Sequence, residues 1–253
     1  MISKAKIGET LDRNKFLQRL YRMNFAKVME AKIIWEFLEP KRGEVIGNIA
    51  CGTAVQSIEL ARKGCRVYSI DRNKHALETA KSIAGGYDCN FQLGDAENLP
   101  YMSNALDKVI CVCALEHFEN DEKSLAEMNR VLKGGGTLVL TVDSFTLKGI
   151  KDSLKEKHKN WYGVVNYYSL PQLRHKLENA GFDVEKSKYF INSPLSAFFF
   201  SIILKIRLRY PSALIFPIAY ILSSVSDRLW ANTNEGYLLA VKAKKRLNIP
   251  PQL

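Results

Sequence analysis

Short apolar runs and helix-like spacings alternate along the middle of the chain. Five runs predict strands, at residues 44–49, 66–70, 91–93, 107–113 and 137–142. Three stretches with helical spacing lie between them, at residues 53–63, 73–84 and 121–132. We expect the glycines at 134–136 to end the last of these helices. Strands that alternate with helices predict a parallel sheet that helices cover on both faces.

The pattern changes at both ends of this middle region. Residues 14–38 predict one or two amphipathic helices. Beyond residue 150 we expect a charged helix, a helix that a Ser169–Gln172 capping box opens and Gly181 ends, and two final strands at 182–190 and 236–242. An apolar stretch, about 194–230, separates those two strands.

These elements predict an α/β fold of the Rossmann-like, doubly wound kind. Its sheet would have seven mostly parallel strands, with an apolar helical insertion before the last strand. The predicted organisation has four segments: an N-terminal helical segment (1–42), a cofactor-binding core (43–190), the apolar insertion (191–232) and the last strand with the C-terminal tail (233–253).

Composition narrows the classes of protein. With 253 residues and 47% hydrophobic residues, the chain can bury a full core, which excludes disorder for most of it. No run of 18–20 apolar residues predicts a standard spanning helix, and the N-terminus has no apolar signal core, so a cytoplasmic location is expected. The five cysteines are an odd number without metal-ligand spacing, which predicts reduced thiols and no metal site.

The net charge of +11 is unevenly distributed. Residues 1–42 carry a net charge of +5, residues 43–150 carry −3 and residues 151–253 carry +9. Two basic flanks around a slightly acidic middle suit a protein that contacts nucleic acid or one that lies on anionic lipid.

Small and acidic residues follow three successive strands. The turn at residues 50–54 contains a single glycine among small residues, which lets a ligand approach the backbone. Asp71 ends the next strand, where a carboxylate can accept both hydroxyls of a ribose, and Asp95 ends the third, where it could reach an adenine amino group. Together at the carboxyl edge of an open sheet, these residues favour a nucleoside over a dinucleotide.

The sequence resembles the class I S-adenosylmethionine-dependent methyltransferases, of the type that includes quinone and lipid methyltransferases. Four segments carry the resemblance in order: Ile46 to Ala54, Val67 to Asp71, Leu93 to Pro100, and Leu106 to His117 followed by Asn129 to Gly136. It implies S-adenosylmethionine as cofactor, with S-adenosylhomocysteine as product. It also implies a cofactor site built from Asn48, Ala50, Cys51, Gly52, Asp71, Arg72, Asp95, Ala96, Glu97 and Cys113.

The chain departs from the family at three positions of the loop. Asn48 stands where the family usually has an acid, and Ala50 and Ala54 stand where it has glycines. A cofactor-binding or scaffold protein without catalysis is therefore one alternative. For a catalytic protein the predicted base is His117, with Glu116 as second choice, and Tyr21, Tyr162 and Tyr168 are candidates to line the acceptor pocket.

The charge pattern of the apolar insertion indicates the kind of methyl acceptor. Residues 189–204 and 210–226 carry no charge, while Lys205, Arg207 and Arg209 stand between them. This pattern favours an interfacial helical pair on an anionic membrane surface over a spanning hairpin. We therefore expect a membrane-associated enzyme, peripheral on the inner face of the membrane, with a hydrophobic small-molecule or lipid acceptor such as a quinone or prenylated compound.

One alternative keeps the methyltransferase reaction without the membrane. The insertion could be a lid or a dimer interface, in a soluble enzyme for a small molecule or sugar. Nucleic acid is disfavoured because the fourth strand leads into Cys111-Val-Cys-Ala-Leu-Glu116, without the Asn/Asp-Pro-Pro signature of amino-methylating nucleic-acid enzymes.

Overall fold

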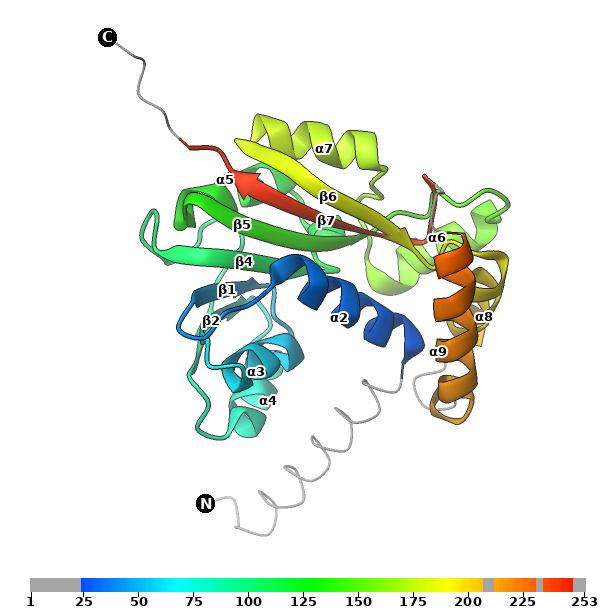
Figure 1. Cartoon of the computed structure of the whole chain (residues 1–253), viewed down its shortest axis with the longest axis horizontal. Coiled ribbons are helices and arrows are strands. Elements are labelled where there is room, and N and C mark those ends of the chain that lie inside the picture. Colours follow the sequence, from blue (N-terminus) through cyan, green and yellow to red (C-terminus); the bar gives the residue numbers. More distant parts are fainter. Residues whose placement is uncertain (1–23, 207–211, 231–233, 248–253) are drawn as a thin grey trace.

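The computed structural model describes residues 24–206, 212–230 and 234–247, which surround a seven-stranded sheet (Figure 1). The strands lie in the order β3–β2–β1–β4–β5–β7–β6. Their bounds are β1 (Val45–Ile49), β2 (Arg66–Asp71), β3 (Cys89–Leu93), β4 (Leu106–Val112), β5 (Leu132–Asp143), β6 (Phe182–Phe190) and β7 (Leu238–Lys245). β1 to β5 pair in parallel, and β7 is antiparallel to both β5 and β6. The predicted seven-stranded, mostly parallel sheet is confirmed.

Helices cover both faces of this sheet. α2 (Phe25–Leu38), α3 (Val55–Arg62), α8 (Pro194–Ile206) and α9 (Ser212–Leu229) pack into one apolar cluster. α5 (Asp121–Val131) and α7 (Leu170–Asn179) pack into a second. Because neighbouring strand residues point to opposite faces, Val139 of β5 enters the first cluster while Leu138 and Leu140 enter the second. The architecture is therefore doubly wound, as predicted.

Three further elements complete the described chain: α4 (Lys74–Ala84), α6 (Asp152–Tyr162) and the single 3₁₀ turn η1 (Leu115–His117). α4 begins where the sequence predicts, because the Asn73 side chain accepts a hydrogen bond from the Ala76 amide. α7 begins at the predicted Ser169–Gln172 capping box.

The glycines at 134–136 do not end a helix, and this expectation is wrong. α5 already ends at Val131, and β5 begins at the next residue, Leu132, whose backbone is extended. The glycines therefore lie within β5. Gly136 is packed so closely that a Cβ would stand 2.8 Å from the Lys133 carbonyl oxygen, which explains a glycine there without any helix stop.

The apolar stretch between β6 and β7 folds into α8 and α9, which pack against each other, while α9 also contacts α2 (Figure 1). Asp227 near the end of α9 accepts hydrogen bonds from the Ile191 and Ser193 amides and from the Ser196 hydroxyl. The helical insertion before the last strand is thus confirmed. The division of the chain into four segments stays a prediction, and residues 14–23 of the predicted N-terminal helices lie outside the described residues.

Candidate functional site

The loop between β1 and α3 repeats a left-handed backbone conformation at every second residue. The φ angles are 55° at Ala50, 53° at Gly52 and 58° at Ala54. In this conformation a side chain with a Cβ costs about 1–2 kcal/mol, so the two alanines hold a shape that glycine adopts without strain. A Cβ placed on Gly52 would meet nothing within 4 Å, so the tip of the loop faces open space.

The Asp71 carboxylate joins the end of β2 to this loop. One oxygen accepts a hydrogen bond from the Gly52 amide at 2.7 Å, and the other accepts from the Asn73 amide at 2.8 Å. The Cys51 amide donates to the Ile70 carbonyl at 2.9 Å. The structure therefore brings Ala50, Cys51, Gly52 and Asp71 together, with Arg72 exposed beside them.

Asn48 lies below the loop in a buried chain of polar side chains. Its amide donates to the Ser57 hydroxyl at 2.8 Å, and the Ser69 hydroxyl donates to the same oxygen at 2.8 Å. Cys51 is buried beside the loop, and burial raises its pKa to about 12, so it stays a thiol. Neither side chain brings a negative charge to the carboxyl edge of the sheet.

The segment after β3 lies at the same edge of the sheet. Asp95 is exposed and accepts a hydrogen bond from the Glu97 amide at 2.9 Å, while Ala96 is buried. The Glu97 side chain turns toward the start of α5, where it accepts from the Asn120 amide at 3.3 Å. Asp95 is thus the carboxylate of this segment that remains accessible at the strand ends.

η1, directly after β4, carries both candidate bases. His117 is half-buried, and its Nδ1 lies 3.1 Å from the Gly163 carbonyl oxygen. Because a carbonyl oxygen only accepts, this contact requires the proton on Nδ1 and leaves Nε2 as the acceptor of the neutral ring. Glu116 is fully buried, and burial raises its pKa well above the usual range.

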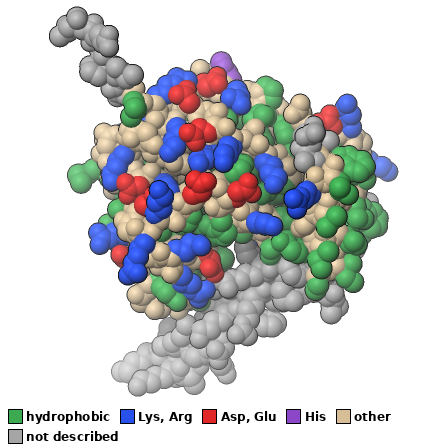
Figure 2. Space-filling view, viewed as in Figure 1, with side chains coloured by type: hydrophobic (Ala, Val, Ile, Leu, Met, Phe, Trp, Pro, Cys, Tyr) green, Lys and Arg blue, Asp and Glu red, His purple; other side chains and the backbone are tan. Residues whose placement is uncertain are grey.

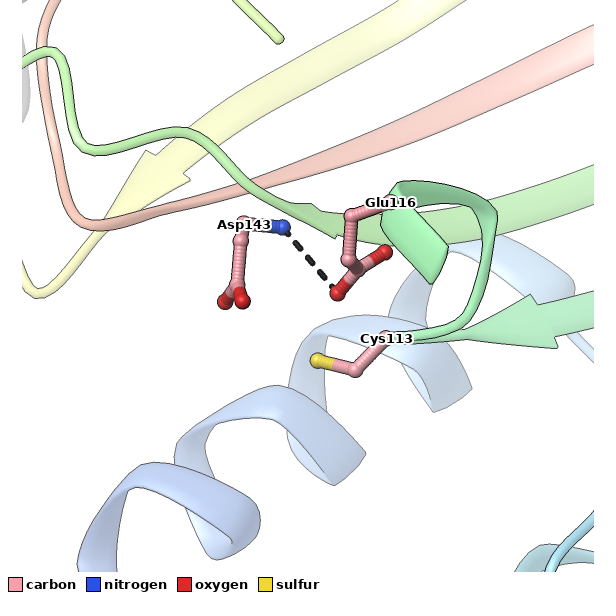
Figure 3. Close-up of side chains that lie close together, drawn as sticks. All are labelled: Cys113, Glu116 and Asp143. Carbon is pink, nitrogen blue, oxygen red and sulfur yellow. Dashed lines mark hydrogen bonds between the residues drawn. The ribbon is translucent and has the colours of Figure 1, made fainter. Parts of the chain in front are cut away.

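Cys113 occupies a position between carboxyl groups. One ligand atom from each of Cys113, Glu116 and Asp143 lies within 4.8 Å of the other two (Figure 3). Cys113 has a left-handed backbone (φ 44°), and its thiol donates to Glu30 of α2 at 2.8 Å. Burial raises the pKa of this thiol well above its usual range.

Two residues of this region, Glu30 and Asp143, are not predicted from the sequence. Asp143 ends the fifth strand, so the rule that selects Asp71 and Asp95 at strand ends would also have selected it. Glu30 has no such signal, because it lies within the apolar helix α2 and its contacts with the sheet depend on how that helix packs.

The aromatic candidates for an acceptor pocket do not converge. Tyr168 is buried and its hydroxyl donates to Asp121, so it belongs to the core. Tyr162 is largely exposed at the end of α6, and Tyr21 lies outside the described residues.

The outer face of α9 is apolar. Its exposed side chains follow helical spacing and are 42–78% exposed: Ile218, Ile221, Leu222, Val225 and Leu229, here called the α9 face. The inward side carries the small residues Ala219 and Ser223. Figure 2 shows hydrophobic side chains along the right-hand edge of the molecule, over α8 and α9. No helix among the described residues has both the length and the hydropathy needed to cross a bilayer.

Residues 48–140 match a family described as a methyltransferase domain. Over 155 residues the chain is 28% identical to sterol 24-C-methyltransferase of Saccharomyces cerevisiae, covering 57% of this chain and 40% of that protein. Over 103 residues it is 33% identical to demethylmenaquinone methyltransferase of Corynebacterium glutamicum, covering 41% and 43%. The chain spans less than half the length of these two curated relatives.

Solved structures share the fold over most of the chain. An S-adenosylmethionine-dependent methyltransferase from Mesorhizobium loti superposes with a TM-score of 0.63 at 15% identity, covering 85% of this chain and 97% of that chain. Phosphoethanolamine N-methyltransferase 2 of Haemonchus contortus, in complex with S-adenosylmethionine, gives a TM-score of 0.64 at 18% identity, covering 87% and 52%.

Proposed function

We propose that this chain is a class I S-adenosylmethionine-dependent methyltransferase that methylates a hydrophobic acceptor at a membrane surface, because residues 48–140 match a methyltransferase domain and the curated relatives named above are methyltransferases. The cofactor would lie across the carboxyl ends of β1 to β4. The observation that carries this proposal is the Asp71 carboxylate, held at the end of β2 against the open tip of the β1–α3 loop.

The residues at this edge fit the nucleoside half of the cofactor. Asp71 offers carboxylate oxygens for the ribose hydroxyls, and Asp95 is exposed one strand further, where an adenine amino group would lie. The left-handed loop at Ala50, Gly52 and Ala54 lets the backbone approach the ligand closely.

When bound, S-adenosylmethionine supplies an activated methyl group for displacement at carbon. The chain's contribution is alignment, since rigid positioning of two reactants lowers the barrier by several kcal/mol. His117 is the proposed base where the acceptor must lose a proton. Its Nδ1–H is held by the Gly163 carbonyl, which orients Nε2 to accept that proton.

Two observations support a hydrophobic acceptor and a peripheral position on a membrane. The α9 face exposes five large apolar side chains on one helix, which lies beside α2. Residues 151–253, which include this helix, carry a net charge of +9. The relatives named for a sterol and for demethylmenaquinone are consistent with an acceptor of this chemistry.

Titration calorimetry with S-adenosylhomocysteine tests the cofactor site. We expect Asp71→Ala to weaken binding by at least about tenfold, because a charge-assisted hydrogen bond contributes about 1.5–3 kcal/mol. The matched control is Asp88→Ala, which removes an exposed carboxylate paired with Arg66 at the opposite end of the same strands. Equal affinity in the wild type and Asp71→Ala would contradict this site.

A further inference from the structure

Three carboxyl groups from separate elements meet around Cys113. Glu30 comes from α2, Glu116 from η1 and Asp143 from the end of β5, and each residue is at most 7% exposed. We call Glu30, Glu116 and Asp143 the acidic cluster. Figure 3 shows the Glu116 and Asp143 carboxyl groups close together beside Cys113, and the ends of β4 and β5 that lead to these residues lie at the carboxyl edge of the sheet.

The three carboxyl groups differ in how well they are satisfied. Glu30 accepts hydrogen bonds from the Cys113 thiol and the Thr141 hydroxyl and pairs with Lys27 at 2.8 Å. Glu116, in contrast, has one buried oxygen, Oε2, without a hydrogen-bond partner among the described residues. Its other oxygen accepts only a long bond, 3.3 Å, from the Asp143 amide.

Asp143 is similarly short of partners. Within the described part of the chain, no hydrogen bond reaches its carboxylate, and its nearest basic group is Nε2 of His158 at 3.7 Å. That histidine is neutral near pH 7, because burial lowers its pKa to about 4. The Tyr167 hydroxyl donates to the Lys155 carbonyl, so it accepts from His158 Nδ1, and Nε2 carries no proton to offer.

The net charge of the acidic cluster indicates which ligand it can hold. Lys27 neutralises Glu30. Burial raises the pKa of Asp143 to about 7 and that of Glu116 well above its usual range, so the two share a proton near neutral pH. About one negative charge remains, which matches a single monovalent cation better than a divalent metal.

Building on the proposed function, we infer that the Glu116–Asp143 pair binds one ammonium group, brought either by the amino-acid end of S-adenosylmethionine or by an amine acceptor. The structure favours the cofactor as the source. Asn48 is uncharged and donates to Ser57, and the Asp71 carboxylate is assigned to the ribose, so neither is left to pair with the ammonium of the amino-acid end.

Calorimetry with two nucleosides tests this inference. S-Adenosylhomocysteine carries the ammonium group, and 5′-methylthioadenosine shares its nucleoside and sulfur but lacks the amino-acid end. We expect Asp143→Asn and Glu116→Gln to weaken S-adenosylhomocysteine binding by at least about tenfold and to change 5′-methylthioadenosine binding less than about threefold. Asp183→Asn, on the exposed side of β6, is the matched control.

Proton release gives a second, independent measurement. An ammonium group favours the ionised form of both carboxyl groups, so its binding should expel their shared proton. Titrations at pH 6.5 in two buffers of different ionisation enthalpy should show protons released by the wild type with S-adenosylhomocysteine. Asp143→Asn should release fewer protons than the wild type, and neither protein should release any with 5′-methylthioadenosine. The other titratable groups around the Glu116–Asp143 pair are Glu30, Lys27, Cys113, His117, His158 and Tyr167.

A third arm separates the two sources of ammonium. Hexylamine is titrated into each protein with and without S-adenosylhomocysteine, with hexanol as the uncharged control. Hexylamine binding that Asp143→Asn abolishes, with unchanged S-adenosylhomocysteine affinity, assigns the site to an amine acceptor. If both variants bind both nucleosides and hexylamine as the wild type does, or if Mg²⁺ or Zn²⁺ binds at the pair instead, the inference is wrong. If the wild type binds neither nucleoside, the proposed function is contradicted. The hexylamine titration then still tests whether the Glu116–Asp143 pair binds an ammonium group.

Discussion

At the scale of single residues, the β1–α3 loop keeps its conformation without its usual residue type. Ala50 and Ala54 both hold positive φ angles, at a cost of about 1–2 kcal/mol each. The hydrogen bonds from Cys51 to Ile70 and from Gly52 to Asp71 fix the backbone between them. Alanine in place of glycine at these two positions therefore leaves the shape of the loop intact. It adds backbone strain and reduces the space beside the loop.

Replacing Ala54 tests this strain. Ala54→Gly relieves left-handed strain but adds the chain entropy of glycine, so we expect the free energy of unfolding to change by less than about 1 kcal/mol. Ala54→Val adds a branched side chain at a buried, left-handed position and should cost at least about 2 kcal/mol. Urea unfolding measures both. The control is Ala126→Gly, at an exposed position within α5, which should lower the free energy of unfolding by about 1 kcal/mol. If Ala54→Gly lowers it as much, the left-handed strain at Ala54 is contradicted.

Asp143 should make stability depend on pH. Burial raises its pKa from 3.8 to about 7, so the folded protein keeps a proton that the unfolded chain has lost between about pH 4 and 7. Stability therefore falls as pH rises through this window, and the loss is complete above pH 7. Asp143→Asn cannot ionise, so its stability relative to the wild type should rise by at least about 1 kcal/mol from pH 5 to pH 8.

Urea midpoints of both proteins at the two pH values measure this effect. His158 has the opposite tendency, because burial lowers its pKa to about 4 and its stabilising contribution is lost below about pH 6.5. This opposing contribution is confined to pH values below about 6.5, so the fall in wild-type stability above that pH is assigned to Asp143. A stability difference that stays constant from pH 5 to pH 8 would show that Asp143 ionises as an exposed aspartate does.

Strand-end position explains which site residues the sequence could predict. Asp71 and Asp95 directly follow apolar runs, and the carboxyl ends of parallel strands meet at one edge of a sheet, so local sequence is enough to group them. Glu30 contacts Thr141 and Cys113 only through the packing of α2 on β4 and β5, residues far apart in the sequence. Such a contact leaves no local pattern in the sequence, so the sequence does not predict that Glu30 belongs to the acidic cluster.

At the scale of elements, α9 reverses the usual arrangement of a surface helix. Among the side chains described for this helix, the small residues Ala219 and Ser223 face the protein, and the large apolar residues of the α9 face are exposed. The buried Ser223 hydroxyl has no hydrogen-bond partner among the described residues. An exposed apolar helix face of this kind is consistent with the proposed contact with a second apolar surface.

Three substitutions on the α9 face test the membrane surface. Ile218→Asn, Ile221→Asn and Val225→Asn, combined in one protein, should abolish sedimentation with vesicles of mixed neutral and anionic lipid, because each exposed side chain would lose about 1.5–3 kcal/mol of burial. Unfolding should change little, since these residues are exposed. Val165→Asn, an exposed apolar residue before α7, is the control.

The same variant distinguishes the membrane from a lid. If α9 only closes over the acceptor, the wild type should remain in the supernatant with vesicles, and the triple variant should differ from it only in acceptor affinity. The wild type failing to sediment would remove the membrane surface from the proposal and leave the cofactor site unaffected.

Capping signals and glycines explain the accuracy of the predicted elements. Asn73 and Ser169 fix helix starts through side-chain bonds to nearby amides, so local sequence suffices. The glycines at 134–136 misled the prediction because a helix stop and a tightly packed strand both call for glycine. The distinction depends on Asp107 and Lys133, whose backbone oxygens approach Gly136 across the sheet and along the strand, and no local pattern contains that information.

At the scale of the whole molecule, charge and apolar surface belong to the same part of the chain. The net charge of +9 over residues 151–253 includes the sequence around α8 and α9, whereas residues 43–150, which carry the proposed nucleoside site, have a net charge of −3. In the proposed membrane-bound state, attraction to anionic lipid would therefore act on the C-terminal part rather than on residues 43–150. The α9 face would add an apolar contribution that does not depend on the charge of the lipid.

These two contributions respond differently to salt. The Debye length falls from about 10 Å at 0.1 M to about 3 Å at 1 M, so salt screens the basic residues and leaves apolar burial almost unchanged. Raising salt over this range should reduce the partition coefficient on anionic vesicles at least about tenfold, to the value measured on neutral vesicles. The triple α9 variant should lose binding to both kinds of vesicle at every salt concentration. Binding to anionic vesicles that is insensitive to salt would leave the α9 face as the sole contact, and a triple variant that still binds at low salt would assign the membrane contact to the basic residues alone.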